Sequence, residues 1–197
     1  MFRSIFSIFC IILWLAPSLP SQASSDEIRK MLQDRDEEIK ELLGPSGREY
    51  TQDQRDQLKD IINDIIDYRA MAEFALGNTY QQISAEQQNE FVSLFATIIR
   101  DNSLNRLDIY RADVTYEEIT VSDNQAIVKT IAELDNVRTP VGYKLERKGN
   151  QWMIVDMTID DVSTAESYNR QFQSIIRQRG FDALLESLRR RAARATT

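Results

Sequence analysis

The sequence predicts a single α+β domain with a four-stranded antiparallel sheet and helices packed on one face. Between residues 113 and 160 the apolar side chains recur at every second position, which is typical of strands with one buried face. Before and after this stretch they recur at intervals of three and four, which is typical of amphipathic helices. With 197 residues and no internal repeat, the chain is long enough for one domain with a sizeable core.

The first 23 residues have the features of a secretory signal peptide. Arg3 precedes a short apolar run over residues 5–15, and Ser21 and Ala23 are the small residues expected before a cleavage site. The alternative is an uncleaved anchor helix, for which the run is short. Cleavage after Ala23 leaves residues 24–197 as one mature domain, which we expect in the bacterial periplasm. That domain must be held by packing alone, because the one cysteine, Cys10, lies in the removed segment.

Helices are predicted on both sides of the strand region. Three of them begin with a capping box. In this motif the hydroxyl of the first residue accepts a hydrogen bond from the backbone amide three residues later, and the side chain of that later residue accepts one from the backbone amide of the first. The pairs are Thr51 with Gln54, Ser84 with Gln87, and Ser163 with Glu166. A further helix is expected over residues 25–43, ending at Gly44, with a short one around Met71 and a last one after Gly180.

Four strands are expected to form a meander. They cover residues 113–121, 125–134, 137–147 and 153–160. Gly149 and Asn150 are typical of a hairpin turn between the last two. Strict alternation along the last strand predicts one face with Met153, Val155, Met157 and Ile159, and an opposite, solvated face with Asp156 and Asp160.

The residue inventory argues against an enzyme. The chain has no histidine, so His-based triads and His metal sites are excluded, and the mature domain has no thiol nucleophile. The densest acidic group, Asp156 with Asp160 and Asp161, is expected to be solvated surface charge rather than a catalytic or calcium site. We expect no catalytic residue, metal or cofactor.

Charge is distributed unevenly along the mature domain. Residues 24–164 carry a net charge of −12, whereas residues 165–197 carry seven arginines and three acids, a net of +4. The net charge of −8 over residues 24–197 gives little support for nucleic-acid binding. The basic end is a candidate docking surface, with Arg170, Arg177, Arg179, Arg189 and Arg190 as its members. The alternative is that these cations only stabilise and solubilise the end of a C-terminal helix.

The second expected strand carries small residues on its apolar face. They are Ala126, Val128, Thr130 and Ala132. If the helical stripe around Phe91 and Phe95 lies opposite them, an internal void can remain. The alternative is an ordinary core, because small and large side chains routinely pair in filled interiors.

A series of short elements stands between residues 137 and 189: Val137-Arg138-Thr139, Tyr143-Lys144-Leu145, Trp152 with Asp156, Val162-Ser163, Tyr168-Asn169-Arg170-Gln171-Phe172, and Gly180 before Leu184-Leu185. In order and spacing these elements resemble the MlaC (toluene-tolerance) family of periplasmic phospholipid-binding proteins. Upstream, residues 71–77 and the helix with Phe91 and Phe95 also resemble the family. Asp161 departs from it, standing where a glycine is usual, and residues 25–50 show no resemblance.

The resemblance implies a curved sheet and helices that enclose an apolar cavity for phospholipid. It further implies a carrier between the outer and inner membranes that maintains outer-membrane lipid asymmetry. The implied partners are an outer-membrane lipoprotein complex and an inner-membrane ABC transporter with an MCE-domain protein. The expected lipid-binding residues are Phe91, Phe95, Ala126, Val128, Val141, Tyr143, Met153, Val155 and Met157. The alternatives are an enzyme of similar architecture, with a carboxylate and a tyrosine in the cavity, and a structural adaptor with a filled core.

Overall fold

The computed structural model of the chain describes residues 22–45, 50–104 and 107–195. The expected signal peptide therefore lies almost wholly outside the described residues. Within the described ranges, no helix combines the length and apolar character needed to cross a membrane.

Helices precede and follow a continuous run of strands, in the order expected. The elements are α1 (Gln22–Leu43), α2 (Gln52–Asp64), α3 (Tyr68–Leu76), η1 (Gly77–Gln82), α4 (Ala85–Leu104), η2 (Leu107–Arg111), β1 (Asp113–Ser122), β2 (Gln125–Leu134), β3 (Val137–Lys148), β4 (Gln151–Ile159), β5 (Val162–Ser163), α5 (Thr164–Arg179) and α6 (Phe181–Ala195), where η1 and η2 are 3-10 helices. The α+β class is confirmed.

The expectation of four strands was wrong, because the described part of the chain forms a five-stranded sheet. Neighbouring strands pair antiparallel in the order β1-β2-β3-β4-β5. Asp160 and Asp161 have φ values of 49° and 60°, a left-handed conformation that aspartate tolerates better than most residues. They form a tight turn that returns Val162 and Ser163 onto Ile159 and Thr158. A strand of two residues is too short to show any periodicity in the sequence.

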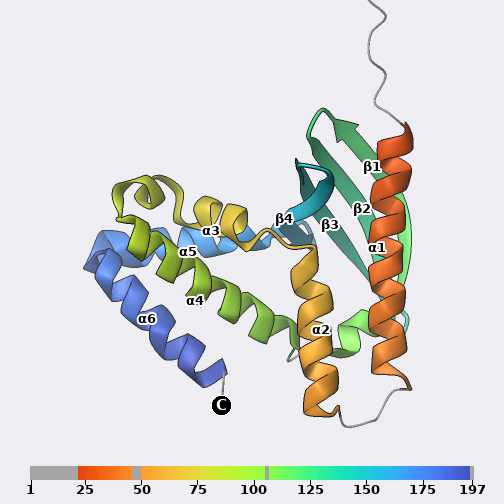
Figure 1. Ribbon diagram of the computed structural model, residues 1–197, viewed down its shortest axis with the longest axis horizontal. Coiled ribbons are helices and arrows are strands. Elements are labelled where there is room, and N and C mark those ends of the chain that lie inside the picture. Colours follow the sequence, from red (N-terminus) through yellow and green to blue (C-terminus); the bar gives the residue numbers. More distant parts are fainter. Residues whose placement is uncertain (1–21, 46–49, 105–106, 196–197) are drawn as a thin grey trace, which may run out of the picture.

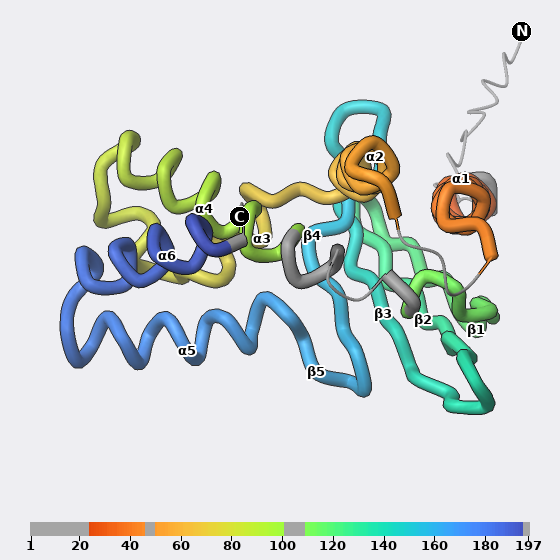
Figure 2. Tube along the Cα trace, turned by 90° about the horizontal axis from the view of Figure 1, so that it is seen from below, coloured from red at the N-terminus to blue at the C-terminus, as the bar shows by residue number. Residues whose placement is uncertain are grey.

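The helices form two groups. Figures 1 and 2 show α1 and α2 side by side over one face of the sheet, while α3, α4, α5 and α6 form a second body beyond its β4 edge. The prediction that helices cover one face therefore holds for α1 and α2 only. The segment between α2 and the second body pairs with β4, where the amide of Ile154 donates to the carbonyl of Ile65 and the amide of Asp67 donates to the carbonyl of Ile154, at 2.7 and 2.9 Å.

The predicted capping boxes are confirmed at the starts of α2 and α4. At α2 the Gln54 amide donates to Thr51 Oγ1 at 3.2 Å, and the Thr51 amide donates to Gln54 Oε1 at 3.0 Å. At α4 the same exchange joins Ser84 and Gln87, at 3.1 and 3.2 Å. Ser163 likewise caps α5, accepting from the Glu166 amide at 3.0 Å. Local hydrogen bonds therefore set where these helices begin.

Two β-bulges interrupt the alternation of side chains. Glu117 is an extra residue in β1, between the pairs of Tyr116 and Glu118, and Val155 is an extra residue in β4. The expected alternation of the last strand was therefore wrong. Met153 pairs with Glu146, on the opposite face from Met157, because the bulge at Val155 shifts the register between them.

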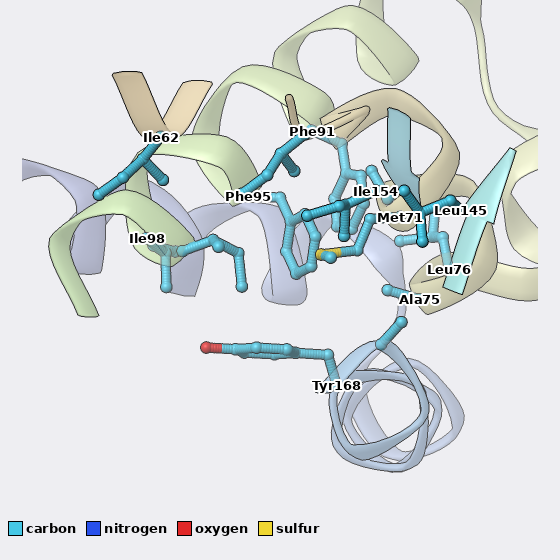
Figure 3. Close-up of a cluster of buried hydrophobic side chains, with 14 of the residues drawn as sticks. Ile62, Met71, Ala75, Leu76, Phe91, Phe95, Ile98, Leu145, Ile154 and Tyr168 are labelled. Carbon is cyan, nitrogen blue, oxygen red and sulfur yellow. The ribbon is translucent and has the colours of Figure 1, made fainter. Parts of the chain in front are cut away.

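The core of the second body is aromatic. Phe91 and Phe95 of α4 are fully buried. The ring centroid of Phe172, on α5, lies 5.7 Å from that of Phe91 and 6.0 Å from that of Phe95. The ring centroid of Tyr168, also on α5, lies 5.1 Å from that of Phe95. Figure 3 shows Phe91, Phe95 and Tyr168 in one buried cluster with Met71, Leu145 of β3 and Ile154 of β4. Phe91 and Phe95 therefore pack against α5, and the ring centroid of Phe181, on α6, lies 6.4 Å from that of Phe91, whereas α1 and α2 are the helices that cover the sheet.

Asp156 is not the solvated surface charge that the sequence suggested. Its carboxylate is partly buried and accepts hydrogen bonds from the backbone amides of Met157 and Ala165, at 2.8 and 3.0 Å, and from the Ser163 hydroxyl. Because Ser163 itself caps α5, Asp156 connects β4 to the start of that helix. The residue is structural.

We predict that Asp156→Asn lowers the free energy of unfolding by about 1–2 kcal/mol. The asparagine amide nitrogen replaces one carboxylate oxygen and cannot accept there, so either the bond from Ser163 or the bonds from Met157 and Ala165 are lost. Asp160→Asn is the matched control, since Asp160 is exposed and asparagine tolerates its positive φ. Urea unfolding of both variants measures the difference. Equal effects at the two positions would contradict the assignment of Asp156.

Candidate functional site

The face of the sheet beneath α1 and α2, here called the inner face, is apolar. In an antiparallel sheet, residues directly opposite each other on neighbouring strands share a face. The pairing gives three rows across β1 to β4: Val121, Ala126, Leu145 and Ile154; Ile119, Val128, Tyr143 and Met157; and Tyr116, Thr130, Val141 and Ile159. Thr130 is the polar exception, and its hydroxyl donates to the Val141 carbonyl at 2.8 Å, so its polar group is satisfied within the sheet.

The inner face is buried at one end and exposed at the other. All four residues of the first row are buried. At the other end, toward β5, the side chains of Ile159 and Val162 are 43% and 53% exposed. Val137, on the same face next to the β2–β3 turn, is 63% exposed. Exposed apolar surface continuous with a core is a common feature of ligand-binding and interaction sites.

Tyrosines gather at the middle of the inner face. Tyr116 and Tyr143 belong to it and lie near each other, Tyr110 of η2 lies near Tyr143, and Tyr68 of α3 lies near Tyr110. Burial raises the pKa of Tyr116 to about 12 and the pKa values of Tyr143 and Tyr68 above the usual range. The nearby carboxylate of Asp36, on α1, adds to the rise in pKa at Tyr116 and Tyr143. These phenols are therefore neutral hydrogen-bond donors at physiological pH.

Two arginines lie against these rings. The Arg29 guanidinium of α1 is 5.1 Å from the ring centroid of Tyr116, and that of Arg100 on α4 is 5.6 Å from the ring centroid of Tyr68. Both distances are within the range of cation–π attraction. The site thus combines an apolar floor, phenol donors and cations.

A separate open depression of about 370 Å³ lies between α1 and α2. Leu42 and Ile61 give it an apolar floor, and its other lining residues are Glu38, Glu41 and Gln57. None of the expected lipid-binding residues lines it.

The structure brings together five of the nine expected lipid-binding residues on the inner face: Ala126, Val128, Val141, Tyr143 and Met157. Of the others, Met153 lies on the opposite face, Val155 is the buried bulge residue, and Phe91 and Phe95 belong to the aromatic core.

Tyr116 and Ile119 also belong to the inner face, although the sequence analysis did not select them. In the sequence, Val114 and Tyr116 are separated by one polar residue, and so are Ile119 and Val121, which is the pattern of a strand with one apolar face. It was hidden because the bulge at Glu117 separates the two pairs.

Three of the five candidate docking arginines are occupied within the molecule. Arg189 binds both carboxylate oxygens of Glu90, at 2.6 and 2.9 Å, and this bond lowers the pKa of Glu90. Arg170 pairs with Glu166 at 3.1 Å, and Arg190 pairs with Glu186. Arg177 and Arg179, in the last turn of α5, are exposed, and no described carboxylate lies within ion-pairing distance of either.

These features define a class: an α+β protein whose helices partly cover an apolar sheet face that carries tyrosines. The family model for the MlaC protein matches residues 24–190, and the chain belongs to this family. Among curated proteins, none is significantly similar to the chain in sequence.

A solved structure of similar fold is that of the phospholipid-binding protein from Ralstonia solanacearum, in complex with a phospholipid. It is 21% identical in sequence, and the match covers 88% of this chain and 98% of that chain, with a TM-score of 0.73. The two proteins share their fold over nearly the full length of the Ralstonia chain.

Proposed function

We propose that this protein binds a phospholipid without a covalent bond and carries it between the outer and inner membranes, maintaining outer-membrane lipid asymmetry. The observation that carries the proposal is the inner face, whose apolar surface extends from the buried core to the exposed side chains of Ile159, Val162 and Val137. Membership of the MlaC family and the phospholipid bound to the Ralstonia protein support the same ligand.

The size of the hydrophobic effect explains why a carrier needs such a surface. Burying one methylene group is worth about 0.8 kcal/mol, so two chains of about sixteen carbons represent on the order of 25 kcal/mol. A lipid cannot leave a bilayer through water at that cost. A carrier must offer apolar contacts that nearly match those of the membrane, so that loading and unloading are both possible.

Binding, rather than catalysis, fits the polar groups of the site. The tyrosines remain protonated, and the Asp36 carboxylate pairs with Lys40 at 2.9 Å. An enzyme that used a tyrosine and a carboxylate would need one of these groups free to accept a proton. The arrangement therefore favours a carrier over the alternative of a cavity enzyme.

The expected location and partners complete the proposal. A signal peptide over residues 1–23 would deliver the protein to the periplasm, where it would meet both membranes. We propose that it exchanges lipid with an outer-membrane lipoprotein complex and with an inner-membrane ABC transporter that carries an MCE-domain protein.

The proposal predicts that Val141→Trp lowers the amount of phospholipid that copurifies with the mature protein. Val141 lies in the partly exposed third row, so a larger side chain there occupies the space of an acyl chain. Ile127→Trp is the matched control, because Ile127 is 44% exposed on the opposite face of β2.

Mass spectrometry of organic extracts measures lipid per protein, and thermal unfolding checks that both variants fold. Wild-type protein without lipid, or equal lipid in the two variants, would contradict acyl binding on the inner face.

Docking is expected to depend on Arg177 and Arg179 more than on Arg189. Because Arg177 and Arg179 have no described carboxylate partner, their charges are available to an acidic surface. Replacing both with serine should slow lipid transfer to membranes that contain the partner complexes, and the difference from wild type should shrink at high salt. Arg170→Ser is the control, since its charge is already paired with Glu166. If the transfer rate of the double variant and its dependence on salt are both the same as for wild type, a docking role for Arg177 and Arg179 is contradicted.

A further inference from the structure

The depression between α1 and α2 is an apolar hollow whose shape is fixed by the protein. Its volume is about 370 Å³, and the partly buried side chains of Leu42 and Ile61 line its floor. Two contacts hold the end of α1 beside it. The Gln54 side chain donates to the carbonyl of Leu42 at 3.2 Å, and Arg111 donates to the carbonyl of Leu43 at 3.3 Å. A hollow that is already formed costs little conformational entropy when a partner binds.

Acidic side chains gather on the sides of α1 and α2 that border this depression. The two helices lie side by side, as Figures 1 and 2 show. Glu38 and Glu41 of α1 line the depression and are exposed. On α2, Asp53 is four residues before the lining residue Gln57 and Asp60 is three residues after it, so all three share one side of the helix.

The arginines of α1 neutralise only part of this charge. Arg35 crosses from α1 to α2, where it pairs with Glu38 at 2.6 Å and also with Asp64. Arg29 is directed to the other side of α1, because its guanidinium lies 5.1 Å from the ring centroid of Tyr116 on β1. It is therefore not available to the carboxylates at the depression.

Three carboxylates at the depression are left without a cation. Glu41, Asp53 and Asp60 are exposed, and no described lysine or arginine lies within ion-pairing distance of them. Like charges on neighbouring helices repel, and a cationic partner would relieve this repulsion. Anionic lipid head groups and nucleic acids would be repelled by the same carboxylates. The charge therefore favours a basic protein segment as the occupant.

We infer that this depression is a docking site for a basic amphipathic segment of a partner protein. Apolar side chains of the segment contact Leu42 and Ile61, and its lysines or arginines pair with the surrounding carboxylates. This arrangement is helix-in-groove recognition, in which apolar residues at helical spacing occupy a groove. The site is opposite in charge to the surface of Arg177 and Arg179, which lies at the other end of the molecule in Figure 1.

The docking site is separate from the inner face, so the inference does not rest on lipid binding. None of the residues that line the depression belongs to the three rows of the inner face. Variants at the depression should therefore keep the lipid content of the wild type. A wild-type protein that carries no lipid would contradict the proposed function without affecting this site.

The test measures the binding of fluorescent synthetic peptides to the mature protein by anisotropy. The first peptide consists of leucine and lysine, with the leucines at helical spacing. A second peptide has glutamate in place of lysine, and a third has serine in place of leucine. The test variant is Glu41→Gln with Asp60→Asn, one unpaired carboxylate from each helix. The matched control is Glu73→Gln with Asp123→Asn, which removes two exposed carboxylates far from the depression.

We expect the test variant to bind the leucine–lysine peptide about threefold to tenfold more weakly than wild type at low salt. The control should stay within about twofold of wild type, and the difference should shrink at high salt. The peptides without lysine or without leucine should bind wild type more weakly. An equal loss in test and control variants would overturn the inference, and so would equal binding of the serine–lysine peptide.

Photolabelling determines where the peptide binds. With a diazirine on one leucine of the leucine–lysine peptide, labels are expected on Leu42, Gln57 or Ile61. Labels confined to other helices would overturn the assignment.

Sedimentation velocity tests the remaining occupant, a second copy of this chain with its arginine-rich α6. Wild-type protein should stay monomeric at the concentrations of the titration. A dimer that dissociates in the test variant would assign the depression to self-association and overturn its role in binding a partner protein.

Discussion

The composition of the inner face depends on the register of the sheet, which two bulges determine. Side chains alternate along a strand, so the insertion of one residue exchanges the faces of everything that follows. The extra residue at Glu117 places Tyr116 and Ile119 on the same face although they are three positions apart. The extra residue at Val155 does the same for Ile154 and Met157. Without these insertions, apolar side chains from β1 and β4 would point toward solvent.

The junction at β4 holds the two halves of the molecule together. Backbone hydrogen bonds from Ile154 and Asp67 tie the end of α2 to one part of this strand, and Asp156 ties the start of α5 to the next part. The aromatic body of α3 to α6 therefore has a fixed position relative to the sheet. In contrast, α1 contacts the inner face chiefly through side chains such as Ile28 and Leu32, and through Arg29 on Tyr116. This division leaves the packed body to provide stability and the inner face to provide the binding surface.

Local sequence patterns predicted those parts of the fold that local interactions determine. The capping boxes marked the starts of α2, α4 and α5, and the uninterrupted alternation of β2 and β3 correctly placed Val128 and Tyr143 on one face. The sequence did not reveal β5, the bulges or the hydrogen bonds of Asp156, because each depends on a pairing between segments that no short pattern records. It also placed Phe91 opposite β2, since helical periodicity shows which side of a helix is buried but not which element covers it.

The central claim is that acyl chains lie on the inner face, and photolabelling tests it most directly. A phospholipid with a diazirine near the end of one acyl chain is bound to the mature protein and irradiated, and the modified residues are mapped by mass spectrometry. The account predicts labels on inner-face residues such as Val141, Met157 and Ile159. Labels confined to the opposite face, on Ile127 or Lys129, or to the depression between α1 and α2, would contradict it.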